Sequence, residues 1–583
     1  MFSRNKNKIT PNNARINFFC FCVFLFSFAI VFKVFKLQIL DYNFYDALAS
    51  DQHQIFKKLF PKRGEIFLQN SQKKNESRTS LYDNLYPAAV NRKYNFFYAE
   101  PNHIENPERT AELLAKYLDL DKEHLLEKFF LKDDPYEPLK HKVSQKITNQ
   151  ITSLGLKGVD FLEEDFRYYP DENIGGHILG FLSSENDTTK GQYGIEEYFN
   201  DLLSGEPGFI KTEKDVKGGI IKIWDTAFYE ARDGADVVLT IDYAVQHKIC
   251  SELKKGVIQY GADGGTIIVM NPETGAILGM CSYPDFSPEK YGEVSDIAVF
   301  NNPAIFDAYE PGSIFKPVTA SIALDLDKIE PNTTYEDTGE VRIGPHVIRN
   351  SDLKAHGVQT MTQVLEKSLN TGAIFMARQA GKENFKKYLE NFGFGQKTGI
   401  ELDTEAGGNI ESLKEDGEIY MATASFGQGI SVTPLQMAVA YSVLANGGKL
   451  PKPHIVDKII KNKKDVQEIQ PEIVRQVVSA RAAKLASAML VSVVEEGHAK
   501  KAGVKGYYVA GKTGTAQVAE NGVYGNKTIH TFAGFAPVDE PKFVLIVKLD
   551  NPKTGIFAES TAVPLANKII EFALNYYGVK PER

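Results

Sequence analysis

Apolar residues are distributed unevenly along the chain, and the longest apolar run lies near its beginning. Within residues 16–32, INFFCFCVFLFSFAIVF, the only polar residues are Asn17 and Ser27, and apolar residues continue to position 40. At about 1.5 Å per helical residue this run reaches roughly 25 Å, near the lower limit for crossing a bilayer core. We therefore predict a transmembrane signal anchor over residues 16–40.

The charges that flank this run predict its orientation. The charged residues before it are all basic: Arg4, Lys6, Lys8 and Arg15. Because basic residues collect on the cytoplasmic side of a span, we expect residues 1–15 to be a cytoplasmic tail and the chain from about residue 41 to lie outside the cytoplasmic (inner) membrane. A cleaved signal peptide is the alternative, since Ala47-Leu48-Ala49 resembles a cleavage site, but this tripeptide lies well beyond the run, which favours an uncleaved anchor.

Residues 41–231 show the patterns of a mixed α and β domain. Apolar side chains recur with helical spacing within 108–130, at Leu113, Leu114, Tyr117, Leu118 and Leu120. Such a stripe normally packs into a core, and we assign it no other role. The turn-forming residues RDGAD at 232–236 indicate the end of this domain.

In the remainder of the chain, residues 232–577, strand patterns occur at both ends and helical patterns lie between them. VVLTI at 237–241 is strand-like, and the segment 265–284 has two apolar runs separated by Asn271-Pro272-Glu273-Thr274-Gly275, which predicts a β-hairpin. Helical patterns follow, and the strand-like TFAGFAPV and KFVLIVKL come near the end. This order predicts an α/β (α+β) domain.

Composition narrows the function classes. With 67 basic and 75 acidic residues the net charge is -8, which argues against a nucleic-acid partner. The chain has 4 cysteines, too few for a disulfide-stapled scaffold. A bond between Cys250 and Cys281 is one alternative, but the sequence favours two small buried apolar residues there. No CxxC or HExxH motif is present, so we predict no structural or catalytic zinc.

Serine and lysine one helical turn apart can form a nucleophile and its base. The Ser-x-x-Lys pattern occurs six times, at Ser3, Ser71, Ser251, Ser287, Ser313 and Ser351. Ser313 stands out because it follows a turn, Glu310-Pro311-Gly312, and opens an apolar run, so we predict it as a helix N-cap residue with Lys316 beside it. A lysine can act as a base there only if burial or a second cation lowers its pKa.

Two further motifs have several copies, and context selects one of each. Ser368-Leu369-Asn370 follows a helical pattern and is predicted to form a helix-to-loop corner, whereas Ser184-Glu185-Asn186 lies in a polar loop. Lys-Thr-Gly occurs at Lys397, Lys512 and Lys553, and Lys512 is predicted to lie on a strand.

A strand that carries Lys512, Thr513, Gly514 and Thr515 could bind an extended peptide by strand addition, with Lys512 as the counter-ion of a carboxylate. The same stretch matches GxxxxGK[ST] literally, but Tyr507 and Tyr508 replace small residues and a strand follows. We therefore reject a phosphate-binding loop.

The order Ser313-x-x-Lys316, Ser368-x-Asn370, Lys512-Thr513-Gly514 resembles that of the class B penicillin-binding proteins. The resemblance extends over nearly the whole chain, in the phrases RGEI, GQYGIEEYFNDLLSGEPG, DVVLTIDYAVQ, YEPGSIFKP, SFGQGISVTPLQMA and GKTGTAQV. Two departures are Ser-Leu-Asn for the commoner Ser-Asp-Asn, and RGEIFLQN without the family's usual turn. No glycosyltransferase signature occurs in 41–230, which argues against a bifunctional class A enzyme.

The resemblance implies a mixed pedestal domain of the dimerisation type and a serine β-lactamase-like transpeptidase domain with an antiparallel sheet flanked by helices. It implies a D,D-transpeptidase for peptidoglycan stem peptides in which Ser313 is the nucleophile, Lys316 its base and Ser368 a proton relay. Asn370 would hold the donor peptide and Lys316. Lys512, Thr513 and Thr515, beside Gly514, would bind the terminal carboxylate, and the amides of Ser313 and Thr515 would form an oxyanion hole.

The resemblance also implies that no metal or cofactor is needed. It implies β-lactams as ligands, and a membrane-embedded glycan polymerase with other division or elongation proteins as partners. The phrases favour a division-type enzyme over an elongation-type one. A β-lactamase or antibiotic sensor would not carry such a pedestal behind an anchor. A non-catalytic scaffold would show a broken motif, and none is broken here.

Overall fold

The computed structural model describes residues 23–27, 30–31, 33, 54–59, 61–71, 80–131, 136–171, 174–185, 188–214, 220–221, 228–520 and 523–583. The predicted tail 1–15 and most of the predicted anchor 16–40 lie outside these residues. Within the described part of the chain, no helix is both long and apolar enough to cross a bilayer. Contacts divide the chain into one compact unit of residues 1–62 and 205–233 and a second of 63–204 and 234–583.

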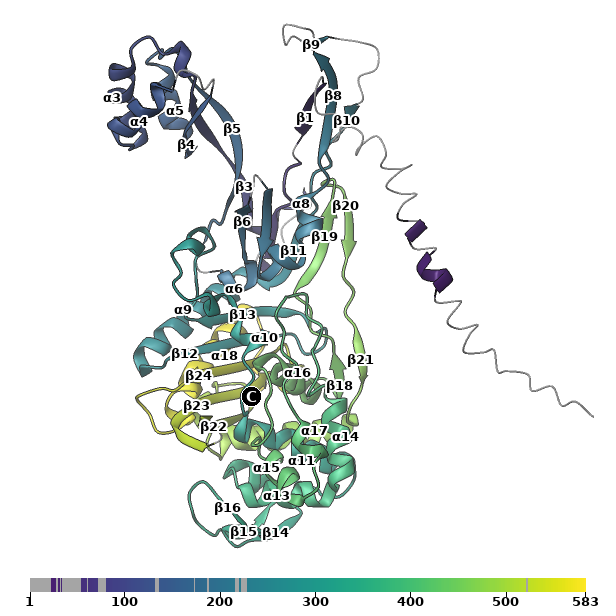
Figure 1. Cartoon of the computed structure of the whole chain (residues 1–583). Coiled ribbons are helices and arrows are strands. Elements are labelled where there is room, and N and C mark those ends of the chain that lie inside the picture. Colours follow the sequence, from purple (N-terminus) through teal and green to yellow (C-terminus); the bar gives the residue numbers. More distant parts are fainter. Residues whose placement is uncertain are drawn as a thin grey trace, which may run out of the picture. The chain divides into compact units, whose positions relative to one another are not determined.

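The first unit contains a small antiparallel sheet (Figure 1). Strand β8 (Gly208–Lys214) pairs through residues 208–213 with all of β1 (Gln54–Leu59). It also pairs with the short strands β9 (Ile220–Ile221) and β10 (Phe228–Tyr229).

A seven-stranded sheet in the second unit joins segments that are far apart in sequence. Its order is β20 (Asp465–Glu468), β19 (Val456–Lys461), β11 (Asp236–Asp242), β2 (Ile66–Gln69), β3 (Leu85–Ala99) and β4 (Glu137–Val143), with β5 (Val159–Tyr168) also paired to β3. The strand predicted at 237–241 is confirmed as β11, and every residue of β11 is buried. It pairs in parallel with β2, so the two halves of this unit share one sheet.

The helical stripe predicted at 108–130 forms two helices rather than one. Helix α3 (Pro107–Leu118) ends at Asp119, whose φ of 51° is left-handed, and α4 (Lys122–Phe129) starts after it. Leu114 and Leu118 are buried in a separate core cluster. This cluster also takes in residues of α5 (Gln145–Thr152) and of β3, so the stripe is core, as predicted.

An ion-pair cluster fixes the start of this region. Arg63, from the phrase RGEI, lies 2.6 Å from Glu196, and Arg167 lies 2.7 Å from the other oxygen of the same carboxylate. The Glu196 side chain is fully buried. A buried carboxylate requires such partners, since an unpaired charge there would be strongly destabilising.

The sheet that carries the predicted site has five antiparallel strands. Their order is β13 (Ile277–Tyr283), β12 (Gly264–Met270), β24 (Phe543–Asp550), β23 (Val523–Ala536) and β22 (Ala510–Glu520). The hairpin predicted at 265–284 is confirmed as β12 and β13, and the two late strands as β23 and β24. Among the described strands, β22, which contains Lys512, has a neighbour on one side only.

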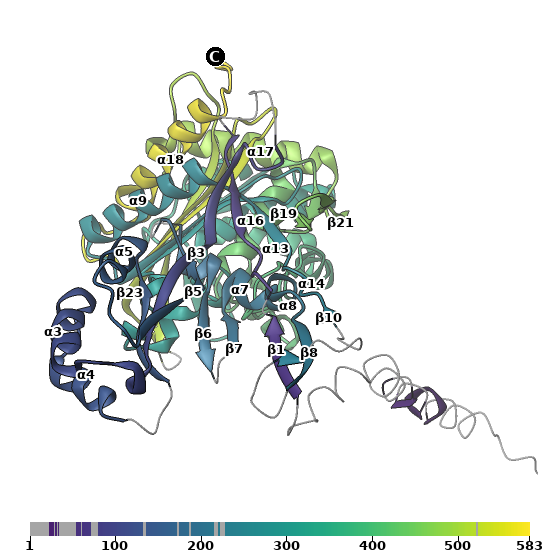
Figure 2. The ribbon, with the colours of Figure 1, turned by 90° about the horizontal axis from the view of Figure 1, so that it is seen from above.

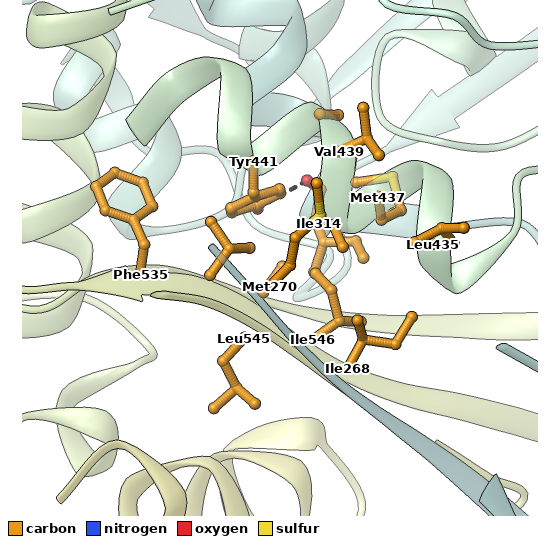
Figure 3. Packing of buried hydrophobic residues seen from close by; sticks show 14 of the residues in the cluster. Ile268, Met270, Ile314, Leu435, Met437, Val439, Tyr441, Phe535, Leu545 and Ile546 are labelled. Carbon is orange, nitrogen blue, oxygen red and sulfur yellow. Dashed lines mark hydrogen bonds between the residues drawn. The ribbon is translucent and has the colours of Figure 1, made fainter. Parts of the chain in front are cut away.

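Helices cover both faces of this sheet. Helices α9 (Tyr243–Tyr260) and α18 (Ala562–Tyr576) lie side by side on one face (Figure 2). On the other are α16 (Pro434–Ala445) and α17 (Ala480–Glu495), and α11 (Lys316–Asp325) packs against α17. Figure 3 shows the core between them: Ile268 and Ile546 are register partners that share a face, whereas Leu545 points to the opposite one. This alternation follows from the two-residue period of a strand.

Shorter elements complete the larger unit. The helices are α6 (Gly176–Leu179), α7 (Gly194–Tyr198), α8 (Asn200–Ser204), α10 (Pro303–Phe306), α12 (Met361–Glu366), α13 (Asn370–Ala380), α14 (Lys382–Asn391) and α15 (Glu418–Ala424). The strand pairs are β6 (Phe181–Glu185) with β7 (Thr188–Gln192), β14 (Thr334–Asp337) with β17 (Gly357–Thr360), β15 (Glu340–Ile343) with β16 (His346–Arg349), and β18 (Lys449–Pro451) with β21 (Ile473–Gln476).

The prediction for the two downstream cysteines is wrong. Cys250 and Cys281 form a disulfide, with their Cα atoms 5.5 Å apart. Cys250 is on α9 and Cys281 on β13, and these two elements pack directly against each other. The sequence could not show this contact, because the bond depends on a helix-to-sheet packing that brings positions 31 residues apart together.

Candidate active site

Ser313 lies in a tight turn that leads into α11. The 3-10 helix η6 (Gly312–Phe315) carries it, and the N–H of Lys316 donates to the Ser313 carbonyl. The predicted N-cap position is therefore wrong, because Pro311 precedes η6 and Phe315 precedes α11. The physical reason is Pro317: it has no N–H to donate to the Ser313 carbonyl, so the chain makes the shorter i to i+3 bond instead.

The turn at Ser313 lies against strand β22. Gly312 has a φ of 58°, and a Cβ placed on it would lie 3.1 Å from the Cβ of Ala516. A Cβ on Gly514 would lie 2.5 Å from Thr531 Oγ1 and 3.1 Å from Ile314 Cγ2. Both glycines therefore permit a close approach that brings the predicted nucleophile beside the Lys-Thr-Gly strand.

One serine hydroxyl connects the two lysines of the site. Lys316 Nζ donates to the Ser368 carbonyl at 2.5 Å and lies 3.3 Å from Ser368 Oγ. Lys512 Nζ donates to the same Oγ at 3.0 Å and to the Thr513 carbonyl at 3.0 Å. The structure thus brings together one residue from each of the three predicted motifs.

Burial shifts the acid–base properties of both lysines. Each has no exposed surface. Burial, together with the charge of Lys512, holds the pKa of Lys316 well below its usual range, and burial lowers the pKa of Lys512 to about 7. Desolvation disfavours an ammonium ion, so Lys316 is suited to accept a proton at neutral pH.

Ser368 has an unusual backbone conformation. Its φ is 57°, in the left-handed region that is costly for residues other than glycine. It lies between the end of α12 and the start of α13, so the predicted helix-to-loop corner is a helix-to-helix corner instead. Strain of this kind often marks a functional position, because the surroundings must enforce it.

Asn370 is the first residue of α13. Its side-chain Nδ2 donates to the Arg349 carbonyl at 2.8 Å, and its backbone N–H donates to Asn350 Oδ1 at 3.0 Å. Among the hydrogen bonds of the described residues none joins Asn370 to Lys316, the contact that the family resemblance implies. Thr515 is half-buried on β22, and its Oγ1 accepts from the Ala558 N–H at 3.1 Å.

The competing motif copies lie elsewhere. Lys553 Nζ pairs with Asp263 at 3.0 Å and is 55% exposed, and Lys397 is exposed in a loop. Ser251 lies on α9, Ser287 precedes a 3-10 helix and Ser351 lies in a turn. Ser3 and Asn186 lie outside the described residues.

Three residues near the site, Glu310, Tyr524 and His498, are not predicted from the sequence. The Glu310 carboxylate accepts from Tyr524 at 3.0 Å and from the Gly429 N–H at 2.9 Å, and burial raises its pKa. His498, which follows α17, is close enough to Lys512 for partial burial and that charge to lower its pKa. Glu310 was visible only as part of a turn, and nothing in the sequence linked Tyr524 or His498 to the three motifs.

Two known protein families match this chain over most of its length. A family model for the "Penicillin binding protein transpeptidase domain" matches residues 265–571, and one for the "Penicillin-binding Protein dimerisation domain" matches 61–239. The chain belongs to the class B penicillin-binding proteins.

Relatives span almost all of this class B penicillin-binding protein. Stage V sporulation protein D of Bacillus subtilis is 37% identical, over 90% of this chain and 79% of its own length. Peptidoglycan D,D-transpeptidase FtsI of Buchnera aphidicola (subspecies Schizaphis graminum) is 30% identical, over 100% and 98%. Both similarities include the predicted site and the region before it.

Solved structures agree on the fold. Penicillin Binding Protein 2X from Streptococcus thermophilus superposes with a TM-score of 0.76 at 23% identity, covering 89% of this chain and 80% of that one. Penicillin binding protein 3 from Mycobacterium tuberculosis, complexed with aztreonam, gives 0.68 at 24% identity, covering 90% and 98%. The expected mixed α/β transpeptidase fold is thereby confirmed.

Proposed function

We propose that this protein is a D,D-transpeptidase that cross-links peptidoglycan stem peptides through an acyl-enzyme on Ser313. The observation that carries the proposal is the Ser368 hydroxyl, which lies 3.3 Å from Lys316 Nζ and 3.0 Å from Lys512 Nζ beside the Ser313 turn. This arrangement provides a nucleophile, a base and a route for a proton. Relatives that are named peptidoglycan D,D-transpeptidases support the assignment.

Acylation begins with attack of Ser313 Oγ on the carbonyl between the two terminal D-alanines. Lys316, whose amine burial favours in the neutral form, accepts the serine proton. The backbone amides of Ser313 and Thr515 then stabilise the negative charge that develops on the carbonyl oxygen. Ser368 Oγ passes a proton to the leaving amine, so that D-alanine departs and the acyl-enzyme remains.

Substrate binding uses the free edge of the sheet. Because β22 pairs with a strand on one side only in the described part of the chain, an extended peptide can pair with its other edge. Lys512, Thr513 and Thr515 bind the terminal carboxylate, and this negative charge favours the protonated form of Lys512. Asn370 contacts the donor peptide. An amine from a second stem peptide attacks the acyl-enzyme and completes the cross-link.

β-Lactams acylate the same serine as mimics of the terminal dipeptide. Support comes from the related structures of Mycobacterium tuberculosis penicillin binding protein 3, which contain aztreonam and ampicillin. A transpeptidase must keep water away from the acyl-enzyme and wait for an amine. The antibiotic adduct is accordingly long-lived.

The proposed location is the outer side of the cytoplasmic membrane, with a single-pass anchor at 16–40 and the N-terminus inside. The charge asymmetry around residues 16–32 supports this topology, and the Cys250–Cys281 disulfide suits an oxidising compartment. Protease added to spheroplasts should digest the chain after the anchor. Full protection of the C-terminal domain would contradict both the topology and the substrate.

The proposed cellular role is septal wall synthesis, with a membrane-embedded glycan polymerase as the partner. The name FtsI among the relatives and the division-like phrases of the sequence support this role over elongation. The domain of residues 41–231 would provide the contact surface for the partner.

The direct test is cross-linking by the full-length protein. Purified chain in detergent is incubated with a glycan polymerase and its lipid-linked substrate, and muropeptides are separated by mass. We expect cross-linked dimers with the wild type and none with Ser313→Ala. Free D-alanine release without dimers would indicate a carboxypeptidase instead.

A further inference from the structure

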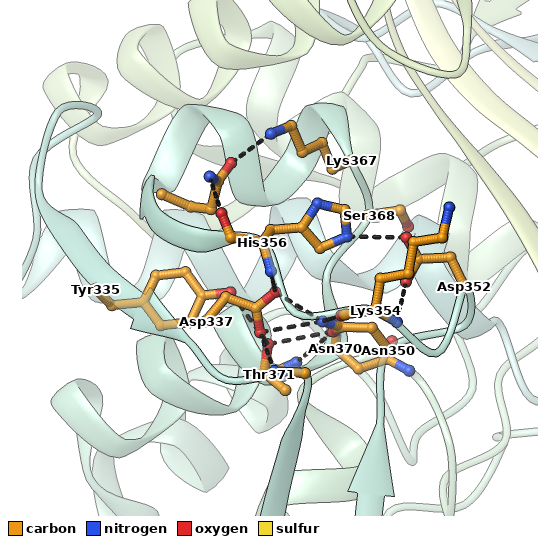
Figure 4. Close-up of polar contacts among 12 residues, drawn as sticks. Tyr335, Asp337, Asn350, Asp352, Lys354, His356, Lys367, Ser368, Asn370 and Thr371 are labelled. Atoms are coloured by element: carbon orange, nitrogen blue, oxygen red, sulfur yellow. Dashed lines mark hydrogen bonds and ion pairs between the residues drawn. The ribbon is translucent and has the colours of Figure 1, made fainter.

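A pair of β-hairpins lies against the two helices that flank Ser368. Strands β14 and β17 form one pair, and β15 and β16 form a second pair within it. Strand β17 leads directly into α12, and both β14 and β16 contact α13. Polar residues gather where these elements meet, and Figure 4 shows their contacts around Asp337 and Asn350.

Helix α13 receives its N-terminal cap from this region. Its own N-cap residue, Leu369, has no side chain that could accept a hydrogen bond. Asn350 Oδ1 accepts instead from the N–H groups of Asn370 at 3.0 Å and Thr371 at 3.3 Å. A side chain 20 positions away in sequence thus supplies the acceptor that a helix start requires.

Asp337 fixes the orientation of Asn350. Its carboxylate accepts from Asn350 Nδ2 at 2.9 Å, and it also accepts from Thr371 Oγ1 at 2.7 Å and from the His356 N–H at 3.0 Å. Asp337 and Asn350 are each only 1% exposed. Because the amide nitrogen of Asn350 must face this carboxylate, its oxygen must face α13.

The same region holds the other helix, α12. Thr360 and Gln363 form a capping box at the start of α12. At its end, Lys367 Nζ donates to Gln359 Oε1 at 2.7 Å, and Gln359 Nε2 donates to the His356 carbonyl at 2.8 Å. Ser368 therefore lies in a short corner between two helices, and residues 337–360 cap the N-terminus of each, Thr360 that of α12 and Asn350 that of α13.

We propose that Asn350 and Asp337 are positioning residues for the acylation step. By fixing the start of α13 they hold Ser368 in its left-handed conformation, with its hydroxyl between Lys316 and Lys512. The neighbouring Arg349 carbonyl orients the Asn370 side chain at 2.8 Å. Neither residue contacts Lys316, Lys512 or Ser313 in the hydrogen bonds of the described chain, so both act through α13.

The test separates chemistry from binding in the full-length protein. Acylation by benzylpenicillin is followed at increasing concentrations, which gives the limiting acylation rate and the dissociation constant of the preceding complex. We expect Asn350→Ala to lower the limiting rate about tenfold to a hundredfold, since a misplacement near 1 Å can cost roughly a hundredfold. The dissociation constant should change by less than about threefold, because the carboxylate site on β22 is untouched.

Asn302→Ala is the matched control. Asn302 is also a buried asparagine, 4% exposed, and it caps α10 through the Ala304 N–H at 3.1 Å. This variant should lose thermal stability yet acylate at the wild-type limiting rate. Both variants are measured at a temperature where they are folded. If the limiting acylation rate of Asn350→Ala then equals that of Asn302→Ala, the positioning role is wrong.

If Asn350→Ala fails to fold, a second test exchanges the two side chains at positions 337 and 350. Asn350→Asp places two carboxylates together and should acylate slowly, whereas combining it with Asp337→Asn restores a donor and an acceptor. We expect the double variant to acylate at least about fivefold faster than Asn350→Asp; equal rates would overturn the inference. The positioning role rests on the proposed acyl-enzyme chemistry. If that chemistry were wrong, the wild-type protein itself would form no adduct, which distinguishes the two failures.

Discussion

Lys512→Ala removes the cation that connects the Lys-Thr-Gly strand to Ser368. Lys512 Nζ donates to Ser368 Oγ and to the Thr513 carbonyl, both at 3.0 Å. A hydrogen bond to a charged group is worth about 1.5–3 kcal/mol, and 1.36 kcal/mol corresponds to a tenfold change. Loss of the contact to the incoming carboxylate should therefore slow acylation about 10- to 150-fold.

The same variant has a second effect of known sign. The charge of Lys512 helps to lower the pKa of Lys316, so its removal should raise that pKa. Less Lys316 is then neutral at a given pH, which reduces the available base. The acidic limb of the pH–rate profile should move to higher pH in Lys512→Ala.

Lys553→Ala and Lys397→Ala are the matched controls, since each removes a lysine from the same tripeptide motif. Lys553 forms an exposed ion pair with Asp263, and exposed pairs contribute at most about 1 kcal/mol to stability. The second-order rate of labelling by fluorescent penicillin should be unchanged in both. If the labelling rate fell strongly in Lys553→Ala but stayed normal in Lys512→Ala, the assignment of the carboxylate site to Lys512 on β22 would be wrong.

Three further outcomes follow from the structure. The second-order acylation rate should rise with pH as Lys316 loses its proton and fall above about 7 as Lys512 loses its own, and a rate that still rises at pH 10 would contradict this assignment. Cys250→Ala should lower the free energy of unfolding by about 3–4 kcal/mol in denaturant titrations, from the entropy of the loop that the disulfide closes. Glu196→Ala leaves two buried arginines unpaired and should cost about 3–5 kcal/mol in the same assay, whereas a loss below about 1 kcal/mol would refute the structural role of the ion pairs.

The three motifs could be recognised from sequence because each couples a residue type to a local context. Lys512 follows an apolar segment and precedes another, so a strand was predictable, and β22 confirms it. Ser313 follows a turn, but its placement as an N-cap failed. The N-cap prediction takes no account of Pro317, whose missing N–H changes the bonding of that turn to a 3-10 pattern.

Contacts between distant segments could not be predicted from local patterns. Asn350 appears as one asparagine in a polar stretch, and its role depends on the packing of β16 beside α13. The Cys250–Cys281 bond likewise needs α9 to pack on β13. Local periodicity specifies elements, whereas these pairs depend on tertiary packing, which a single sequence does not display.

The fate of penicillin on Ser313 tests the central claim most directly. Intact-mass spectrometry after mixing with benzylpenicillin should show a covalent adduct on the wild type that persists far longer than one turnover, with none on Ser313→Ala and very little on Lys316→Ala. Rapid loss of the adduct with steady penicillin hydrolysis would indicate a β-lactamase. A folded wild-type protein that forms no adduct would contradict the proposed acyl-enzyme and favour a non-catalytic scaffold.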